Sequence, residues 1–230
     1  MLLRCVYLLA LLLSSTLAFA SEEEHGDAAV AQAYIKELIK HAHHHNQMHG
    51  PKYLQELSKG QHPRATIVTC SDSRVHTDML DSTPDGQLFM VRNIGNQVAT
   101  APGSVEYGVN HLHSSLLLIL GHSACGAVKA ASGDYSTLEE PIKHELDTIK
   151  IEKGVANIEG VKKNVHDQVA HALELFGDKV KENQLLIIGA VYDFTNDMKQ
   201  GAGEVDVIDV NGDSDPDHIH AALSGSAKEK

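Results

Sequence analysis

The chain has 230 residues, of which 42% are apolar and 22% are charged, as in an ordinary globular protein. This length favours one sizeable domain over several. The formal net charge of −12 argues against a protein that binds nucleic acid, because such proteins need a basic face to neutralise phosphates.

Residues 1–20 have the pattern of a secretory signal peptide. One positive charge, Arg4, precedes an apolar core, and the small residues Ala18 and Ala20 mark a cleavage position just before the acidic SEEE. An uncleaved membrane anchor is the alternative, but the core is short for a spanning helix, which needs about 20 apolar residues. We therefore expect cleavage after Ala20 and a periplasmic or secreted protein.

Residues 21–62 are expected to form an N-terminal helical arm. Apolar residues recur at spacings of three and four from about 28 to 58, and Gly50-Pro51 interrupts the pattern. Within the arm, HAHHHNQMH places His41, His45 and His49 four residues apart, which suits capture of a divalent metal or proton buffering. A solvated helix face without a role is the simpler interpretation of the same run.

Residues 63–210 are expected to form the main domain, an α/β fold with a mostly parallel central β-sheet flanked by helices. The evidence is a set of short, continuous apolar runs, which is typical of strands covered on both faces. Helical patterns separate these runs, as in a parallel sheet. The predicted strands are ATIVT (65–69), QLFMV (87–91), SLLLIL (115–120) and QLLIIGAV (184–191).

The predicted helices of this domain lie at 103–112, where Ser104 is the expected N-cap, and at 161–176. The segment 204–210 alternates polar and apolar residues, which predicts an edge strand. The tail, 211–230, is polar and is expected to be partly mobile.

Cys70 and Cys125 would be the two cysteines left after cleavage, and an oxidising compartment favours a disulfide between them. A metal site is the competing interpretation. Cys70 follows the first predicted strand and Gly121-His122-Ser-Ala-Cys125-Gly126 follows the third, and parallel strands present their carboxyl ends at one edge. Zinc accepts thiolate and imidazole ligands together. Gly121 and Gly126 are expected to allow the turn, and the helix that starts after Gly126 favours a thiolate at Cys125.

Asp72 and Arg74 lie two and four residues after Cys70. The Asp72 carboxylate could fill a fourth ligand position or accept a hydrogen bond from a water on the metal. Pairing with Arg74 favours the second role, because it holds the carboxylate off the metal and keeps it ionised. A surface ion pair near a turn is the alternative.

Four motifs in this order resemble the β-class carbonic anhydrases: CSDSR (70–74), VRNIGN (91–96), GSVEYGV (103–109) and GHSACG (121–126). The likeness continues into NVHDQV (164–169) and VYDFTN (191–196), so that it covers residues 50–210. It implies reversible hydration of CO2 to bicarbonate and a proton, by attack of a zinc-bound hydroxide.

The resemblance also implies roles for individual residues. One Zn2+ per subunit would be held by Cys70, His122 and Cys125, with Asp72 and Arg74 as a catalytic dyad whose aspartate also binds the metal in a closed state. A homodimer, or a dimer of dimers, is expected. The residues implied for substrate binding are Gln61, which reaches the partner's site, together with Phe89, Ile94, Tyr107 and Gly126. Ile67 replaces the tryptophan of the subgroup that bicarbonate inhibits.

Two other functions remain open from the sequence. One is hydrolysis of carbonyl sulfide or carbon disulfide on the same scaffold, because these molecules share the linear shape of CO2. The other is a non-catalytic zinc-binding or redox protein, which a Cys70–Cys125 disulfide would support. The Asp72–Arg74 pair argues against the second, because zinc storage does not need an oriented carboxylate.

Overall fold

The computed structural model describes residues 28–224, so the predicted signal peptide lies outside the described residues. These residues fall into two units that divide between Leu54 and Gln55. The first unit is formed by helix α1 (Ala28–Leu57), which crosses the division and is kinked at Gly50, where φ is 76°. The predicted break at Gly50-Pro51 is confirmed. None of the described helices is both long enough and apolar enough to span a bilayer.

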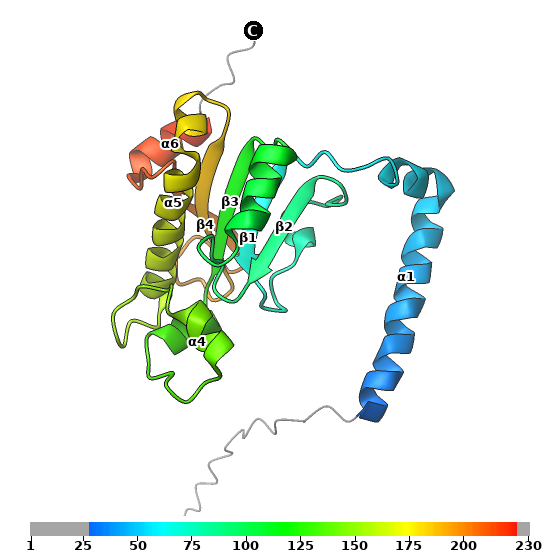
Figure 1. The fold of residues 1–230 in the computed structure, drawn as a ribbon, viewed down its shortest axis with the longest axis horizontal. Helices are drawn as coiled ribbons and strands as arrows, with labels where there is room; N and C mark the ends of the chain where they lie inside the picture. The colour runs from blue at the N-terminus through cyan, green and yellow to red at the C-terminus, as the bar shows by residue number, and fades with distance from the viewer. Residues whose placement is uncertain (1–27, 225–230) are drawn as a thin grey trace, which may run out of the picture. The chain divides into compact units, whose positions relative to one another are not determined.

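The second unit is built on a five-stranded sheet with the order β2-β1-β3-β4-β5. The strands β1 to β4 pair in parallel, and β5 pairs antiparallel with β4 at the edge (Figure 1). The bounds are β1 (Ala65–Cys70), β2 (Leu88–Asn93), β3 (Leu116–His122), β4 (Leu186–Asp193) and β5 (Glu204–Val210). The mostly parallel sheet and the edge position of 204–210 are confirmed.

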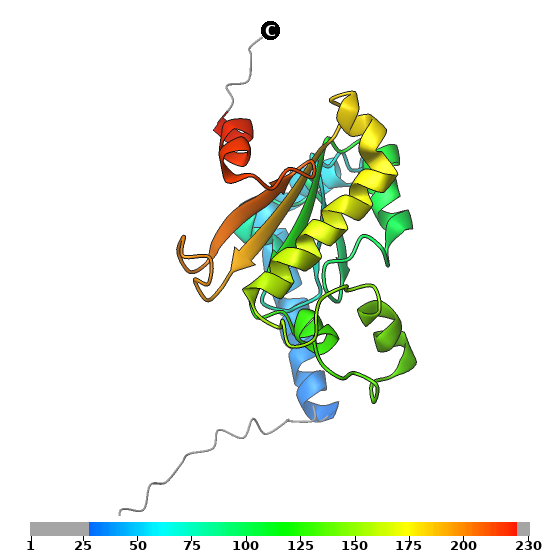
Figure 2. The same cartoon turned by 90° about the vertical axis from the view of Figure 1, so that its left-hand side faces the viewer.

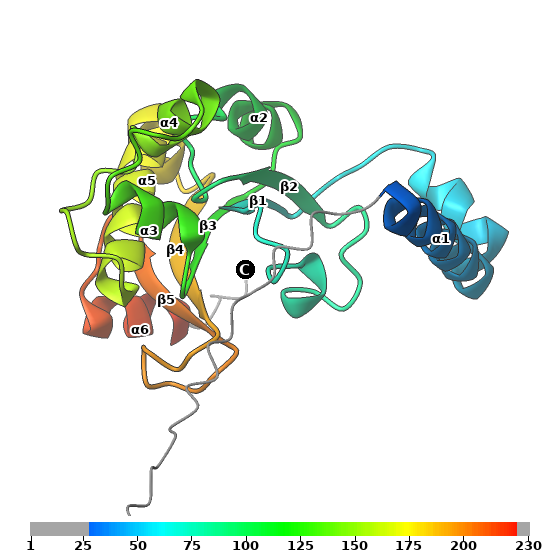
Figure 3. The same cartoon turned by 90° about the horizontal axis from the view of Figure 1, so that it is seen from below.

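The helices that lie between β2 and β4 in the chain gather on one face of the sheet (Figure 3). Their bounds are α2 (Pro102–Glu106), a π-helical turn η2 (Tyr107–His111), α3 (Gly126–Ala131), α4 (Glu140–Leu146) and α5 (Ile158–Lys181). The long helix α5 runs along the sheet (Figure 2). A short 3-10 turn, η1 (Thr77–Met79), follows β1, and α6 (Pro216–Ser224) packs against β5.

Strands β3, β4 and β5 contribute to two apolar clusters, because alternate side chains point to opposite faces of the sheet. Strands β1 and β2 contribute to the larger cluster alone. Ile119, Ile187 and Val191 belong to the larger cluster, which α2, α3 and α5 cover, while Leu120 and Ile188 belong to a smaller one on the other face. This two-sided burial explains why the strands read as continuous apolar runs.

Two glycines allow α5 to lie close to the middle of the sheet. A Cβ at Gly189 of β4 would stand 2.9 Å from methyl groups of both Val165 and Val169, and one at Gly121 of β3 would stand 2.7 Å from Val165. Both distances are shorter than carbon atoms tolerate, so any larger residue would push α5 outward.

Two details differ from the expectations. Helix α2 begins at Pro102 with Ala101 at the N-cap, so the assignment of Ser104 as N-cap is wrong. Proline fits the first turn because its missing N–H would have no helical partner there. The polar tail also contains helix α6, which the sequence analysis missed; it buries Ile219 against the smaller cluster.

We predict that Gly189→Ala lowers the free energy of unfolding by about 1–3 kcal/mol, because the added methyl group overpacks the contact with α5. Gly177→Ala in α5 is the matched control. A Cβ there has open space around it, so replacing a helical glycine should stabilise the protein by about 0.5–1 kcal/mol. Urea denaturation of both variants checks this, and equal effects of the two substitutions would contradict it.

Candidate metal centre

The ends of two neighbouring strands place Cys70 and His122 side by side. Cys70 is the last residue of β1 and His122 the last residue of β3, and these strands pair in parallel with Thr69 opposite Leu120. Cys125 follows after a tight turn and occupies the N-cap of α3. The turn depends on Ala124, whose φ is +54°, and not on positive φ at Gly121 or Gly126. The expected role of these glycines in turning the backbone is therefore wrong.

The three side chains converge in the interior. The Sγ atoms of Cys70 and Cys125 and a ring nitrogen of His122 lie within 4.8 Å of one another. All three residues are buried, with at most 5% of each exposed. Both cysteines are free thiols, so the structure contradicts the disulfide interpretation.

The imidazole of His122 is oriented as a metal ligand. Its Nδ1 lies 2.9 Å from the backbone oxygen of Ser123. Because a carbonyl oxygen only accepts, Nδ1 must carry the proton, and the lone pair of the neutral ring is then on Nε2. Within the described part of the chain, Nε2 is buried and has no hydrogen-bond partner. This is the tautomer that a metal-binding histidine needs.

The two thiols shift each other's pKa in opposite directions. The Cys125 thiol donates a hydrogen bond to the Cys70 sulfur, which holds the pKa of Cys70 well below its ordinary value. The same contact, together with burial, raises the pKa of Cys125. A second buried thiolate therefore requires a nearby cation. The donor set, two sulfurs and one imidazole nitrogen, is one that zinc accepts, so the residues present fit a zinc ion.

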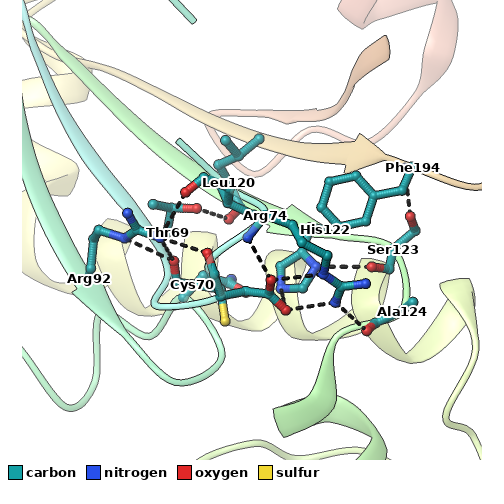
Figure 4. A network of polar contacts seen from close by, with 12 residues as sticks. Thr69, Cys70, Arg74, Arg92, Leu120, His122, Ser123, Ala124 and Phe194 are labelled. Carbon is teal, nitrogen blue, oxygen red and sulfur yellow. Dashed lines mark hydrogen bonds and ion pairs between the residues drawn. The ribbon is translucent and has the colours of Figure 1, made fainter. Parts of the chain in front are cut away.

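Asp72 lies at the rim of this group and is held by Arg74. Arg74 donates from Nε to Oδ1 at 2.9 Å and from Nη2 to Oδ2 at 2.7 Å, and its backbone N–H also donates to Oδ1 at 3.0 Å. These hydrogen bonds hold the pKa of Asp72 well below its usual range, so the carboxylate is ionised. Its Oδ2 lies 3.8 Å from Nε2 of His122, which places a negative charge beside the metal ligands. Figure 4 shows Arg74 close to His122 at this edge of the sheet.

Two supporting residues were missed by the sequence analysis. Arg92 donates to the backbone oxygens of Cys70, Asp72 and Val75 and so fixes the loop that carries the dyad. The ring of Phe194 lies under the guanidinium of Arg74, whose Cζ is 4.9 Å from the ring centroid. The ring centroids of Phe194 and His122 are 5.5 Å apart. Both residues stand inside noted motifs, VRNIGN and VYDFTN, but nothing in those letters indicates which atoms they contact.

An apolar cavity of about 440 Å³ opens beside Cys70 and the carboxylate of Asp72. Ile94 and Gly126, two of the residues expected to bind substrate, line it. The other lining residues are Cys70, Ser71, Asp72, Ala127, Ala130, Ile142 and Leu146.

Phe89, Tyr107 and Gln61 do not line this cavity. Phe89 pairs with Thr66, four residues before Cys70, and is thus about 13 Å away along the sheet. Tyr107 packs against Phe89 with ring centroids 5.9 Å apart, and Gln61 is exposed on the connection that precedes β1. Within one chain, the structure therefore separates these three residues from the metal ligands.

The mostly parallel sheet and the buried Cys-His-Cys group are those of a zinc-binding α/β protein. Comparison with known proteins identifies the family. The family model described as carbonic anhydrase matches residues 65–201, well over half of the chain. The chain belongs to the carbonic anhydrase family, of the β class.

Individual relatives agree with this assignment. Carbonic anhydrase 2 of Mycobacterium tuberculosis is 30% identical over 150 residues, which cover 59% of this chain and 72% of that protein. The carbonic anhydrase of Synechococcus elongatus is 34% identical over 105 residues, and the matched region spans 41% of this chain but only 39% of that relative. The solved structure of the β-carbonic anhydrase CcaA superposes with a TM-score of 0.65 at 25% identity, covering 79% of this chain and 88% of that one.

Proposed function

We propose that this chain catalyses the reversible hydration of CO2 to bicarbonate and a proton. The observation that carries the proposal is the position of Asp72: an ionised carboxylate is held by Arg74 beside three side chains that together fit a zinc ion. A protein that only stored zinc would gain nothing from this oriented charge.

Cys70, His122 and Cys125 would hold the zinc. When bound, zinc supplies a Lewis acid that makes water a nucleophile near neutral pH. Asp72, which Arg74 keeps ionised, accepts a hydrogen bond from water in the cavity and orients it. Arg74 in turn is fixed by Phe194 and by the Ala124 carbonyl, which accepts from Nη2 at 3.2 Å.

The apolar wall of the cavity suits a small, linear and uncharged substrate. Ile94, Ala127 and Ile142 offer carbon surface beside Asp72, so CO2 would be placed there without strong polar contacts. Ser71 and Asp72 are the polar side chains of the lining, so bicarbonate would form beside Asp72.

Two substitutions separate metal binding from catalysis. His122→Ala should abolish both the zinc content and the CO2 hydration, because it removes a ligand. Asp72→Asn should keep the zinc but lower kcat/KM by about 10²–10⁴-fold, because a neutral amide does not replace the charged acceptor. Stopped-flow hydration and elemental analysis of the same samples measure both effects.

Asp78→Asn is the matched control, because Asp78 is nearby in the sequence but its side chain is 82% exposed. It should leave zinc and rate unchanged. A zinc-loaded Asp72→Asn protein with the wild-type rate would rule out the proposed role of the carboxylate.

We also propose that the chain works as a homodimer or a dimer of dimers. Helix α1 has exposed apolar side chains at helical spacing, Val30, Tyr34 and Leu38, which are 63%, 59% and 45% exposed. The separation of Gln61, Phe89 and Tyr107 from the ligands of their own chain also fits a site that a second subunit completes.

Leu38→Asp should therefore shift the protein toward the monomer, because it buries a charge in the proposed contact. Lys40→Asp is the control: two residues further along the helix, it points away from Leu38. Light scattering after size-exclusion chromatography reads out the mass of each. A wild-type protein that is monomeric at micromolar concentration would contradict the proposal.

Export to the periplasm or outside the cell is proposed from residues 1–20 alone, on the pattern of a charged start, an apolar core and Ala18-Phe-Ala20. Expression of the full chain in a Gram-negative bacterium should yield a periplasmic protein that begins at Ser21. Mass spectrometry of the fractions tests this, and a cytoplasmic protein that keeps residues 1–20 would refute it.

A further inference from the structure

The histidine run of α1 is not used by the proposed reaction. His41, His43, His44, His45 and His49 all lie on this helix and all are exposed. We propose that His45 and His49 form a second site of the chain, which binds a divalent transition-metal ion through two imidazoles.

The helix brings these two rings together. Residues four apart lie on the same face, one turn above the other, and two histidines at this spacing form the metal-binding pair of helical zinc motifs. The ring centroids of His45 and His49 are 4.3 Å apart, with an angle of 46° between the planes. The two imidazoles are therefore neighbours on one side of the helix, and rotation about their side-chain bonds would turn one nitrogen of each toward a shared ion.

Tyr53 restricts the ring of His49. The two rings stack with centroids 4.4 Å apart and an angle of 25°. Such a contact limits the orientations of the imidazole before metal arrives, and this lowers the conformational entropy that binding must remove. His41 lies one turn before His45 on the same face, so the pair is flanked by a further imidazole.

The chemistry of the pair sets the class of ligand. Imidazole suits zinc, copper and nickel, whereas magnesium and calcium prefer oxygen donors. In residues 28–224, Cys70, His122 and Cys125 are the one group in which three possible donors already converge. The helical site therefore supplies two protein ligands with water for the rest, and it binds metal more weakly than the buried centre.

The run itself provides a matched control. His43 and His44 lie two residues and one residue before His45, so both point to other sides of the helix. The double variant His43→Gln/His44→Gln removes as many imidazoles as His45→Gln/His49→Gln, but it keeps the pair. This matters because the chain has 16 histidines, and any of them could bind metal non-specifically.

The test is calorimetric titration of Zn2+ into the purified chain whose buried centre is already loaded with zinc. Wild type should bind one further equivalent at pH 7.5. Loss of a group that only hydrogen-bonds to a metal ligand already costs 10–100-fold in metal affinity. Removing both ligands by His45→Gln/His49→Gln should therefore lower the affinity for this second zinc by at least about tenfold. His43→Gln/His44→Gln should bind it as wild type does.

Absence of a further equivalent in wild type, or equal weakening by the two double variants, would overturn the proposal. CO2 hydration is measured separately, so a failure of the proposed reaction would leave this result unchanged.

Discussion

The site depends on the burial of two thiols and one imidazole at a single point between β1 and β3. Cys70, His122 and Cys125 are withdrawn from water, and their donor atoms lie within 4.8 Å of one another. The neighbouring Cys70 sulfur and burial raise the pKa of Cys125, and ionising both thiols would place two charges in the interior. Burying an uncompensated charge costs several kcal/mol, so a cation resolves the conflict that the fold creates.

The surrounding residues are arranged around this buried group. Arg74 donates hydrogen bonds to both carboxylate oxygens of Asp72. Phe194, which directly follows β4, contacts both Arg74 and His122. Arg92 of β2 donates hydrogen bonds to the backbone of the loop after β1, which carries Asp72 and Arg74. Four neighbouring strands thus position one carboxylate beside one metal centre. This explains why the residues involved are scattered along the sequence but lie at one edge of the sheet.

The sequence predicted the sheet well because its strands are buried on both faces, and burial of this kind leaves continuous apolar runs such as SLLLIL. Cys70, His122 and Cys125 could be brought together because parallel strands share a carboxyl edge. Local conformation was less predictable. Ala101 caps helix α2 although Ser104 is the better capping residue. Helix α6 is held by the packing of Ile219, an apolar residue in a mostly polar segment. The contacts of Arg92 and Phe194 depend on tertiary structure and leave no periodic signal.

Both cysteines and His122 are expected to bind the same zinc ion. X-ray absorption at the zinc edge of the purified chain tests it most directly. We expect one zinc per chain with two sulfur ligands at about 2.3 Å and nitrogen or oxygen ligands at about 2.0 Å. A first shell without sulfur, or a zinc-free chain with Cys70 and Cys125 joined as a disulfide, would contradict it.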